Sequence, residues 1–290
     1  MTDTAPPEPH RDELRRLRTH YQFSHAPFSK YGWAEHMYDS TSQKELLHAL
    51  MLWLEVRGIA LVTGPPGVGK SITLRRFVRR MDAARFRVVD FTGYLPSTVH
   101  GFLRSLNRKL ELAPRGHSAD LFDQIQQHLA ATQAETDAHT ILVVDDAEGL
   151  RTPTVDAIRR LTAYKLDAEA LISIVFAGTD DLLKVLRDAV LQPLVSRIVY
   201  TQQLRPFGLE DTRNYIHHHL ERADVSTKLF TDDAVRRIFN ASQGKPRSIN
   251  QLAIQAMIQA VVVGRDQIDG DFLDRLLQQH PFYSSPRSKR

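Results

Sequence analysis

The chain has 290 residues, of which 42% are hydrophobic and 25% charged, with a formal net charge of +4, and these values fit a soluble chain with one large or two smaller cores. It has no cysteine, which excludes disulfides and thiolate metal sites and leads us to expect a cytoplasmic protein. No stretch reaches the roughly 18 apolar residues of a membrane helix, and the polar, proline-rich start is not a secretory signal, so we expect no membrane contact.

Apolar periodicity and turn residues divide the chain, in order, into a polar segment, alternating helices and strands, and a series of helices. Residues 1–20 are polar. Residues 21–35 are aromatic and rich in turn residues, which suits a core segment, an adenine contact or a subunit contact. The expected strands are 59–63, 86–91, 140–145, 171–177 and 197–204. The expected helices are 41–57, 70–81, 97–111, 118–133, 153–165 and 180–187, and then, after Pro206, 209–223, 231–241, 246–263 and 269–279.

The segment between the first strand and its helix, Gly64 to Ser71, has the sequence G-P-P-G-V-G-K-S and fits the phosphate-binding P-loop pattern. Its glycines let the backbone N–H groups surround phosphate oxygens, and the positive end of the following helix points at the same oxygens. We expect Lys70 to reach the β- and γ-phosphates of ATP and Ser71 to ligate Mg²⁺. The expected nucleotide contacts in this segment are Gly64, Pro65, Pro66, Gly67, Val68, Gly69, Lys70, Ser71 and Ile72.

A second part of the same site is expected where the apolar strand 140–145 ends in Asp145 and Asp146. Ligands bind at the carboxyl ends of strands in open α/β sheets, so Asp145 would hold Mg²⁺ and Asp146 would polarise the attacking water. Many ATPases of this kind have glutamate at the second position, so the shorter Asp146 predicts slow hydrolysis or a different water position. Glu148 is a fallback base whose side chain is expected to point away from Asp146. A solvated turn at the strand end is the alternative.

The order of these elements predicts the fold class. One expected strand lies between the P-loop strand and the acidic strand, and another follows, which is the order of additional-strand ATPases and not of Ras-like GTPases. With its helical C-terminal part, the chain resembles the AAA+ ATPases: an α/β P-loop core with a parallel sheet flanked by helices, then a small all-helical lid. The expected divisions are an arm and aromatic segment at 1–35, the nucleotide-binding core at 36–205, the lid at 206–282 and a basic tail at 283–290.

Three further positions match AAA+ motifs, and the resemblance implies their roles. Thr179 corresponds to the polar sensor of the γ-phosphate, with Asp180 as a cap of the next helix. Arg197, in L-V-S-R-I, corresponds to the arginine finger that stabilises the transferring phosphoryl group in a neighbouring subunit, with an ordinary surface arginine as the alternative. Arg247, in G-K-P-R-S-I-N at the start of a lid helix, corresponds to the lid arginine that contacts the γ-phosphate.

Within this class the chain resembles the ExeA-type ATPases, on H-x-P-F at 25–28, Y-x-S-x-S at 38–42 and R-G-I-A-L-V-T-G at 57–64, together with the two arginine motifs. One branch of that group assembles secretion systems and carries a membrane segment and a wall-binding domain. The other, which includes Mu B, IstB and TnsC, assists transposases. The chain shows neither extra part, so the resemblance implies a transposition helper. Asp146-Ala147-Glu148 departs from the more usual Glu-Ala-His or Glu-Ala-Gln, which bears on the hydrolysis rate and not on nucleotide binding.

The basic residues of the chain bear on its partners. Residues 71–110 hold nine basic and two acidic residues, a distribution that favours a polyanion, with a solvated helix face as the alternative. Arg104, Arg108 and Lys109 are the leading contacts to double-stranded DNA. Arg75 and Arg79 are weaker candidates, because the helix after a P-loop is often covered.

The resemblance implies that ATP drives self-assembly into a ring or a helical filament on DNA, a hexameric turn being one option, and that the assembly recruits or activates a transposase. Three alternatives remain open at this point. They are an ExeA-like secretion-assembly ATPase, a relative of the replication initiators and clamp loaders, and a signalling ATPase with protein partners only.

Overall fold

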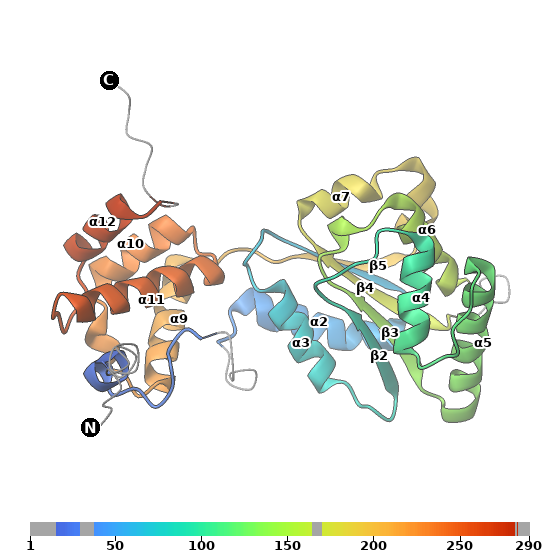
Figure 1. The fold of residues 1–290 in the computed structure, drawn as a ribbon, viewed down its shortest axis with the longest axis horizontal. Helices are drawn as coiled ribbons and strands as arrows, with labels where there is room; N and C mark the ends of the chain where they lie inside the picture. Colours follow the sequence, from blue (N-terminus) through green and yellow to red (C-terminus); the bar gives the residue numbers. More distant parts are fainter. Residues whose placement is uncertain (1–15, 30–37, 164–169, 282, 284–290) are drawn as a thin grey trace, which may run out of the picture. The chain divides into compact units, whose positions relative to one another are not determined.

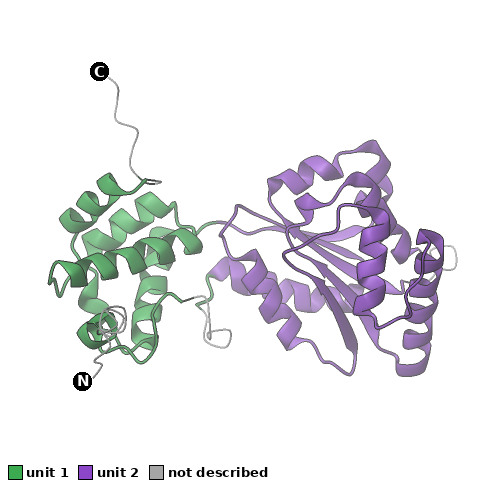
Figure 2. Ribbon diagram, in the orientation of Figure 1, with its two compact units in different colours: residues 1–40, 206–290 green, residues 41–205 purple. Residues whose placement is uncertain are grey.

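The computed structural model describes residues 16–29, 38–163, 170–281 and 283, which form two compact units (Figures 1 and 2). Unit 2 is Thr41–Arg205, and unit 1 combines Met1–Ser40 with Pro206–Arg290. The expectations for residues 1–15, 30–35 and 284–290 lie outside the described residues.

Unit 2 is built on a five-stranded sheet in which all paired strands are parallel, in the order β2-β3-β4-β1-β5. β4 lies between β1, which leads to the P-loop, and β3, which leads to the acidic pair. This confirms the additional-strand order expected from the sequence. Every residue of β1, β3 and β4 is buried, as continuous apolar runs of a central parallel sheet require. The strands are β1 (Ile59–Thr63), β2 (Phe86–Phe91), β3 (His139–Val144), β4 (Ile172–Gly178) and β5 (Ile198–Gln203).

Helices cover both faces of this sheet (Figure 1). Ala60 and Val62 of β1 pack with the apolar residues of α2 and α3, whereas Ile59 and Leu61 pack with those of α4, α5 and α6. Because alternate residues of a strand point to opposite faces, α3 and α4 lie on opposite sides of the sheet. The helices are α2 (Thr41–Val56), α3 (Lys70–Arg80), α4 (Val99–Lys109), α5 (Ser118–Thr136), α6 (Thr152–Thr162), α7 (Asp180–Leu186) and α8 (Gln192–Val195), with 3₁₀ turns η1 (Ala147–Gly149) and η2 (Ala189–Leu191).

The C-terminal part of unit 1 packs the helices α9 (Leu209–Arg222), α10 (Asp232–Ser242), α11 (Pro246–Val262) and α12 (Gly270–Gln279), with a 3₁₀ turn η3 (Thr227–Leu229). The N-terminal segment belongs to the same core, since Phe28 is only 1% exposed there. The hydroxyl of Tyr21 donates to the Met257 carbonyl at 3.0 Å, and that of Tyr38 donates to Asp211 at 2.9 Å. Of the three roles considered for the aromatic segment, Phe28 therefore has that of a core residue.

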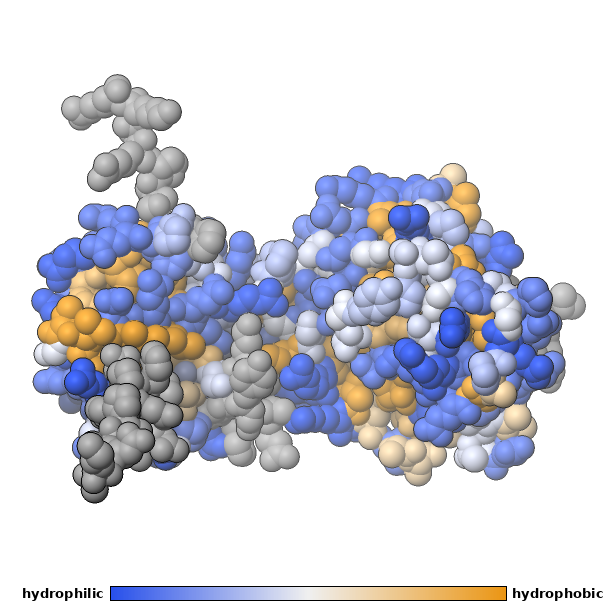
Figure 3. Space-filling view, viewed as in Figure 1, coloured by the Kyte–Doolittle hydropathy of each residue, from blue (hydrophilic) through white to orange (hydrophobic). Residues whose placement is uncertain are grey.

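The surface of unit 1 carries apolar side chains at the end of α11. Ile258, Val262 and Val263 are 43%, 72% and 58% exposed. Figure 3 shows an apolar band on the visible face of this unit. Among the described residues, no helix combines the length and the apolar character that crossing a membrane requires.

Candidate nucleotide-binding site

The P-loop joins the carboxyl end of β1 to the start of α3, which is the strand–loop–helix context expected from the motif. Its glycines have φ angles of 149° at Gly64, 81° at Gly67 and 113° at Gly69, which side chains with a Cβ rarely adopt. At Gly64 an added Cβ would also lie 2.6 Å from the Leu204 carbonyl oxygen. The loop therefore turns tightly, with the N-terminus of α3 at its end.

Lys70 is buried, and its ammonium lies within the P-loop itself. It donates to the carbonyl oxygens of Gly64 at 2.7 Å and Pro65 at 3.4 Å. Ser71, in the first turn of α3, is exposed. A phosphate group on this loop would find backbone N–H donors, a helix N-terminus and a lysine ammonium together.

Gln43 of α2 is a site residue that sequence reasoning missed. It is 5% exposed, and its side-chain amide lies where a Cβ on Gly69 would have to go. The sequence does contain a sign of this role. Gln43 lies three residues before Leu46, on the buried face of α2, where a polar side chain is unusual. The contact means that α2 and the P-loop are packed together at the last glycine of the motif.

Asp145 follows β3 and is 4% exposed, and its backbone N–H donates to the Phe91 carbonyl of β2. One carboxylate oxygen accepts the N–H of Asp146 at 3.1 Å. Asp146 has a φ of 53°, in the left-handed region, and its residue is exposed at the start of η1. The two acids thus face different surroundings: Asp145 is fixed at the strand end, and Asp146 is open to solvent.

Glu148 reaches from η1 to the end of β4. Its carboxylate accepts the backbone N–H of Thr179 at 3.1 Å and occupies the place where a Cβ on Gly178 would lie. Gly178 pairs in register with Thr63, the residue before the P-loop. The carboxylate of Glu148 therefore lies at the end of β4, the strand that separates β1 from β3. The sequence did not predict this position.

Thr179 follows the last residue of β4, at the same carboxyl end of the strands as the P-loop. Its hydroxyl accepts the N–H of Asp181 at 3.4 Å, which makes Thr179 the N-cap of α7. The expectation that Asp180 caps this helix is wrong, because Asp180 is its first residue and its carboxylate accepts from Gln203 at 3.2 Å. Thr179 thus joins the end of the sheet to α7.

Arg197 lies at the opposite end of the strands, where β1 and β5 begin. It precedes β5, and its carbonyl accepts the N–H of Ile59, the first residue of β1. Its guanidinium donates to the Pro193 carbonyl at 2.6 Å. The five residues of β1 span roughly 16 Å at about 3.3 Å per residue, and this length separates the amino ends of the strands from the P-loop.

Arg247 belongs to unit 1, where it is exposed in the first turn of α11 after Pro246. The preceding turn is tightly fixed. Gly244 has a φ of 66°, a Cβ there would collide with the Phe207 carbonyl oxygen, and the Phe207 N–H donates to Gly244. The G-K-P-R-S-I-N motif thus holds the helix start that presents Arg247 to solvent.

The five basic residues expected to contact DNA are all exposed, including the two weaker candidates on α3. They do not form one surface, however. Arg75 and Arg79 lie on α3, and Arg104, Arg108 and Lys109 lie on α4, across the sheet. Lys109 also lies 5.4 Å from the ring of Phe91. The single basic stretch of the sequence becomes two separate surfaces.

The chemistry of the P-loop and of Asp145 fits a magnesium nucleotide. The loop supplies N–H donors and a cation for phosphates, and a buried carboxylate and a hydroxyl supply the hard oxygen ligands that Mg²⁺ prefers. Within the described residues, no group of three or more His, Cys, Asp or Glu side chains could hold a metal by itself.

Comparison with known proteins agrees with this geometry. Residues 54–186 match the family model of an AAA domain. General secretion pathway protein A of Aeromonas hydrophila is 28% identical over 252 residues, which cover 86% of this chain and 45% of that protein. The chain therefore spans less than half the length of this relative.

Solved structures with the same fold include Cdc6p from Pyrobaculum aerophilum, with a TM-score of 0.63 and 20% identity over 83% of this chain and 67% of that one. A chain of Drosophila ORC bound to DNA gives a TM-score of 0.64 and 16% identity over 96% of this chain and 68% of that one. The fold is thus the α/β P-loop AAA+ fold with a helical C-terminal region, as expected. The similarity to General secretion pathway protein A favours the secretion-assembly alternative over the transposition helper.

Proposed function

We propose that the chain is an ATP-hydrolysing AAA+ switch that assembles with further copies of itself when ATP is bound. The observation that carries the proposal is the opposite placement of the P-loop and Arg197 at the two ends of the paired strands β1 and β5. An arginine finger has to contact the γ-phosphate. Because Arg197 is a strand length away from its own P-loop, its target is the P-loop of a second copy.

In the proposed reaction, water attacks the γ-phosphorus of ATP and the bond to the β–γ bridging oxygen breaks, giving ADP and phosphate. Lys70 binds the phosphate oxygens, Asp146 polarises the water, and Thr179 detects the γ-phosphate. Glu148 positions Thr179 through its backbone N–H. Ser71 and Asp145 would hold Mg²⁺, which neutralises phosphate charge when bound. Arg247 would couple unit 1 to the nucleotide.

The process that this switch serves is proposed to be the assembly of a secretion apparatus. The support is the similarity to General secretion pathway protein A, which extends over most of this chain. A protein partner of that apparatus then takes the place of the transposase.

DNA is the second candidate partner. It is favoured by the exposed cations of α4, and by the similarity of the fold to that of ORC, which was solved bound to DNA. Contacts from such cations would go to phosphates, so binding would weaken steeply with salt.

Sedimentation of the protein in ATP, ADP or a slowly hydrolysed ATP analogue, with and without duplex DNA, tests these proposals. Assembly in ATP or the analogue without DNA supports the switch with a protein partner. Assembly that requires DNA and dissolves as salt rises supports the second candidate. Equal sedimentation in every nucleotide would contradict both.

Mixing two inactive variants tests the sharing of a site between copies. Lys70→Ala should abolish ATP binding and turnover, and Arg197→Ala should bind ATP but neither assemble nor hydrolyse it. A mixture of the two should recover part of the turnover, because one intact P-loop can then meet one intact Arg197. Turnover by Lys70→Ala alone would refute the site, and normal assembly by Arg197→Ala would place the finger elsewhere.

A further inference from the structure

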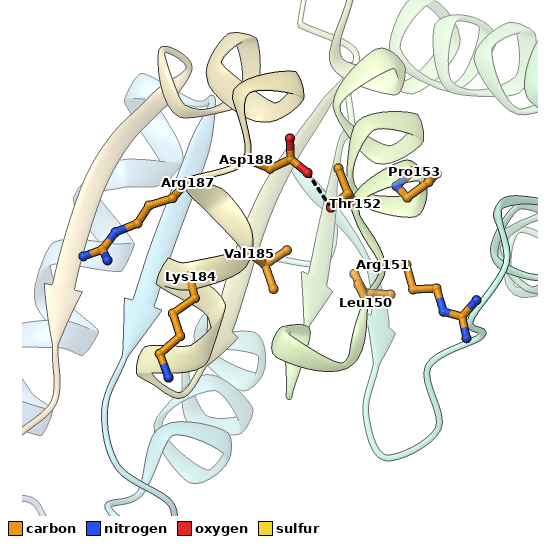
Figure 4. A pocket seen from close by; sticks show the side chains of 8 residues that line it. All are labelled: Leu150, Arg151, Thr152, Pro153, Lys184, Val185, Arg187 and Asp188. Carbon is orange, nitrogen blue, oxygen red and sulfur yellow. Dashed lines mark hydrogen bonds between the residues drawn. The ribbon is translucent and has the colours of Figure 1, made fainter.

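An open groove of about 740 Å³ lies in unit 2 where the residues before α6 approach the end of α7 (Figure 4). None of the residues assigned to the nucleotide site lines it. Its volume is within the range of about 300–1,000 Å³ that is usual for binding clefts. The proposed ATP switch therefore does not account for this groove.

The groove has an apolar floor and basic rims. Leu150, which is 3% exposed, and the half-buried Val185 lie between the two walls. In Figure 4, Arg151 extends on the α6 side, whereas Lys184 and Arg187 lie on the α7 side. A hydrogen bond of 3.1 Å from the Thr152 hydroxyl to the Asp188 carboxylate joins the walls at one end.

The charges of the rims are not balanced within the groove. In the part of the chain that the structure describes, Arg151 and Arg187 make no ion pair. The Asp188 carboxylate accepts hydrogen bonds from Thr152 and from the Val190 N–H. Lys184 pairs with Asp181 at 2.6 Å, but both side chains are exposed, and such pairs contribute little. The N-terminus of the 11-residue α6 adds partial positive charge.

We propose that this groove docks an acidic segment of a partner protein. An apolar side chain of the segment would cover Leu150 and Val185, and its carboxylates would pair with Arg151 and Arg187. Duplex DNA fits the groove less well, because phosphates match the rims but leave the apolar floor uncovered. The mixture of an apolar centre and a charged rim is typical of protein-binding surfaces.

Both walls of the groove continue from the nucleotide site. Leu150 follows η1, which carries Glu148, and α7 follows Thr179. The hydrogen bond between Glu148 and Thr179 links the starts of the two walls. Docking itself does not rest on ATP hydrolysis, so it can be tested separately from the proposed switch.

A displayed library of random peptides, selected on the wild-type protein, provides the probe. Enriched peptides should combine acidic with apolar residues, and anisotropy of their labelled forms should show roughly tenfold weaker binding to the double variant Arg151→Glu/Arg187→Glu. The variant Arg104→Glu/Arg108→Glu makes the same charge change on α4 and should bind normally. Failure to enrich acidic peptides, or equal loss in both variants, would overturn the proposal. The proposal would also be overturned if Arg151→Glu/Arg187→Glu weakened the binding of labelled duplex DNA and left peptide binding unchanged.

A second measurement locates the bound peptide. Because the chain has no cysteine, Val185→Cys introduces a unique thiol on the groove floor. Saturating peptide should slow modification of this thiol several-fold, and an unprotected thiol under saturation would place the peptide elsewhere. Lys70→Ala should retain peptide binding, so failure of the ATP site and failure of the groove are distinguished.

Discussion

At the residue scale, two carboxylates in one short turn after β3 have different surroundings. Asp146 is exposed, whereas Glu148 accepts the Thr179 N–H and packs where Gly178 has no side chain. Thr179 in turn caps α7. The geometry makes Glu148 a positioning residue that fixes the end of β4 and the start of α7.

Two substitutions separate the hydrogen bond of Glu148 from its charge. Glu148→Ala should lower kcat by roughly tenfold with little change in ATP affinity, because misplacing a group near the reacting atoms slows the chemistry. Glu148→Gln should retain most of kcat, since its amide oxygen still accepts the Thr179 N–H. Steady-state ATPase rates and binding of a fluorescent ATP analogue measure the two effects. Equal loss in both variants would show that the charge of Glu148 matters and not its hydrogen bond.

The motif residues of the site could be predicted from sequence, and their supporting residues could not. The P-loop and Asp145 follow from local patterns whose chemistry is carried by the motif itself. The contact of Glu148 with Thr179 joins residues 31 apart in the chain, across two strand ends. Gln43 reaches Gly69 from another helix. Such contacts depend on the packing of whole elements, which the spacing of residues does not encode.

At the element scale, the amino ends of three central strands are joined by a polar chain. Nε2 of His139, at the start of β3, lies 2.8 Å from the Ser173 hydroxyl of β4, which accepts the N–H of Gly58 before β1. His139 is 1% exposed, and its Nδ1 has no hydrogen-bond partner among the described residues. Burial, with a smaller effect of Arg57, lowers the pKa of His139 to about 4.

Acid should therefore destabilise unit 2 through His139. Below the unfolded pKa of about 6.5, the unfolded chain binds a proton that the folded chain excludes until about pH 4, so the free energy of unfolding falls as pH falls. Between about pH 7 and 5 this loss should be on the order of 2 kcal/mol. Urea unfolding at the two pH values measures it. His139→Gln, which keeps a hydrogen-bonding side chain, should show a smaller pH dependence; an unchanged dependence would assign the effect to other groups.

The two basic helices should not act together on DNA, because the sheet separates them. We expect Arg104→Glu/Arg108→Glu to weaken duplex binding and to reduce the slope of log K against log salt by about 2, since two phosphate contacts are lost. Arg75→Glu/Arg79→Glu is the matched control on the opposite face and should bind DNA normally. Binding titrations at several salt concentrations decide this, with ATP turnover as a check on folding. If both pairs contribute equally, DNA does not bind through the α4 face alone.

The elements themselves were predicted to within a few residues of their observed bounds. Uniform apolar runs identify β1, β3 and β4, and helical periodicity with caps identifies α9 to α12. The placement of α3 and α4 on opposite faces did not follow from one basic stretch, because net charge along a sequence carries no information about faces. The short η1 and α8 were missed because each is shorter than the window over which periodicity can be recognised.

At the scale of the whole molecule, unit 1 is made from both ends of the chain. Phe28 lies at ring-centroid distances of 5.1 Å from His219 of α9 and 6.5 Å from Phe230. A single aromatic residue near the N-terminus thus fills the core of a helical unit that begins almost 180 residues later.

Phe28→Ala should destabilise unit 1 by about 3–5 kcal/mol, as removal of a buried aromatic side chain usually does. The sheet of unit 2 does not include Phe28, so its thermal transition should be unchanged. Calorimetry or hydrogen exchange resolved by segment distinguishes the two units. Phe23→Ala, at a partly buried aromatic position of the same segment, should cost less. A shift in unit 2 alone would contradict the assignment.

Because unit 1 is formed by two segments that are distant in the sequence, the two units can fold only in a fixed order during synthesis. The Tyr21 hydroxyl and the Met257 carbonyl are 236 positions apart, so the partners of the N-terminal segment leave the ribosome after the whole of unit 2. Unit 2, which spans residues 41–205, has its full sequence available earlier. The segment around Phe28 must therefore wait, with its apolar side chain uncovered, while a complete nucleotide-binding core folds beside it. Translation thus makes unit 1 complete only after unit 2.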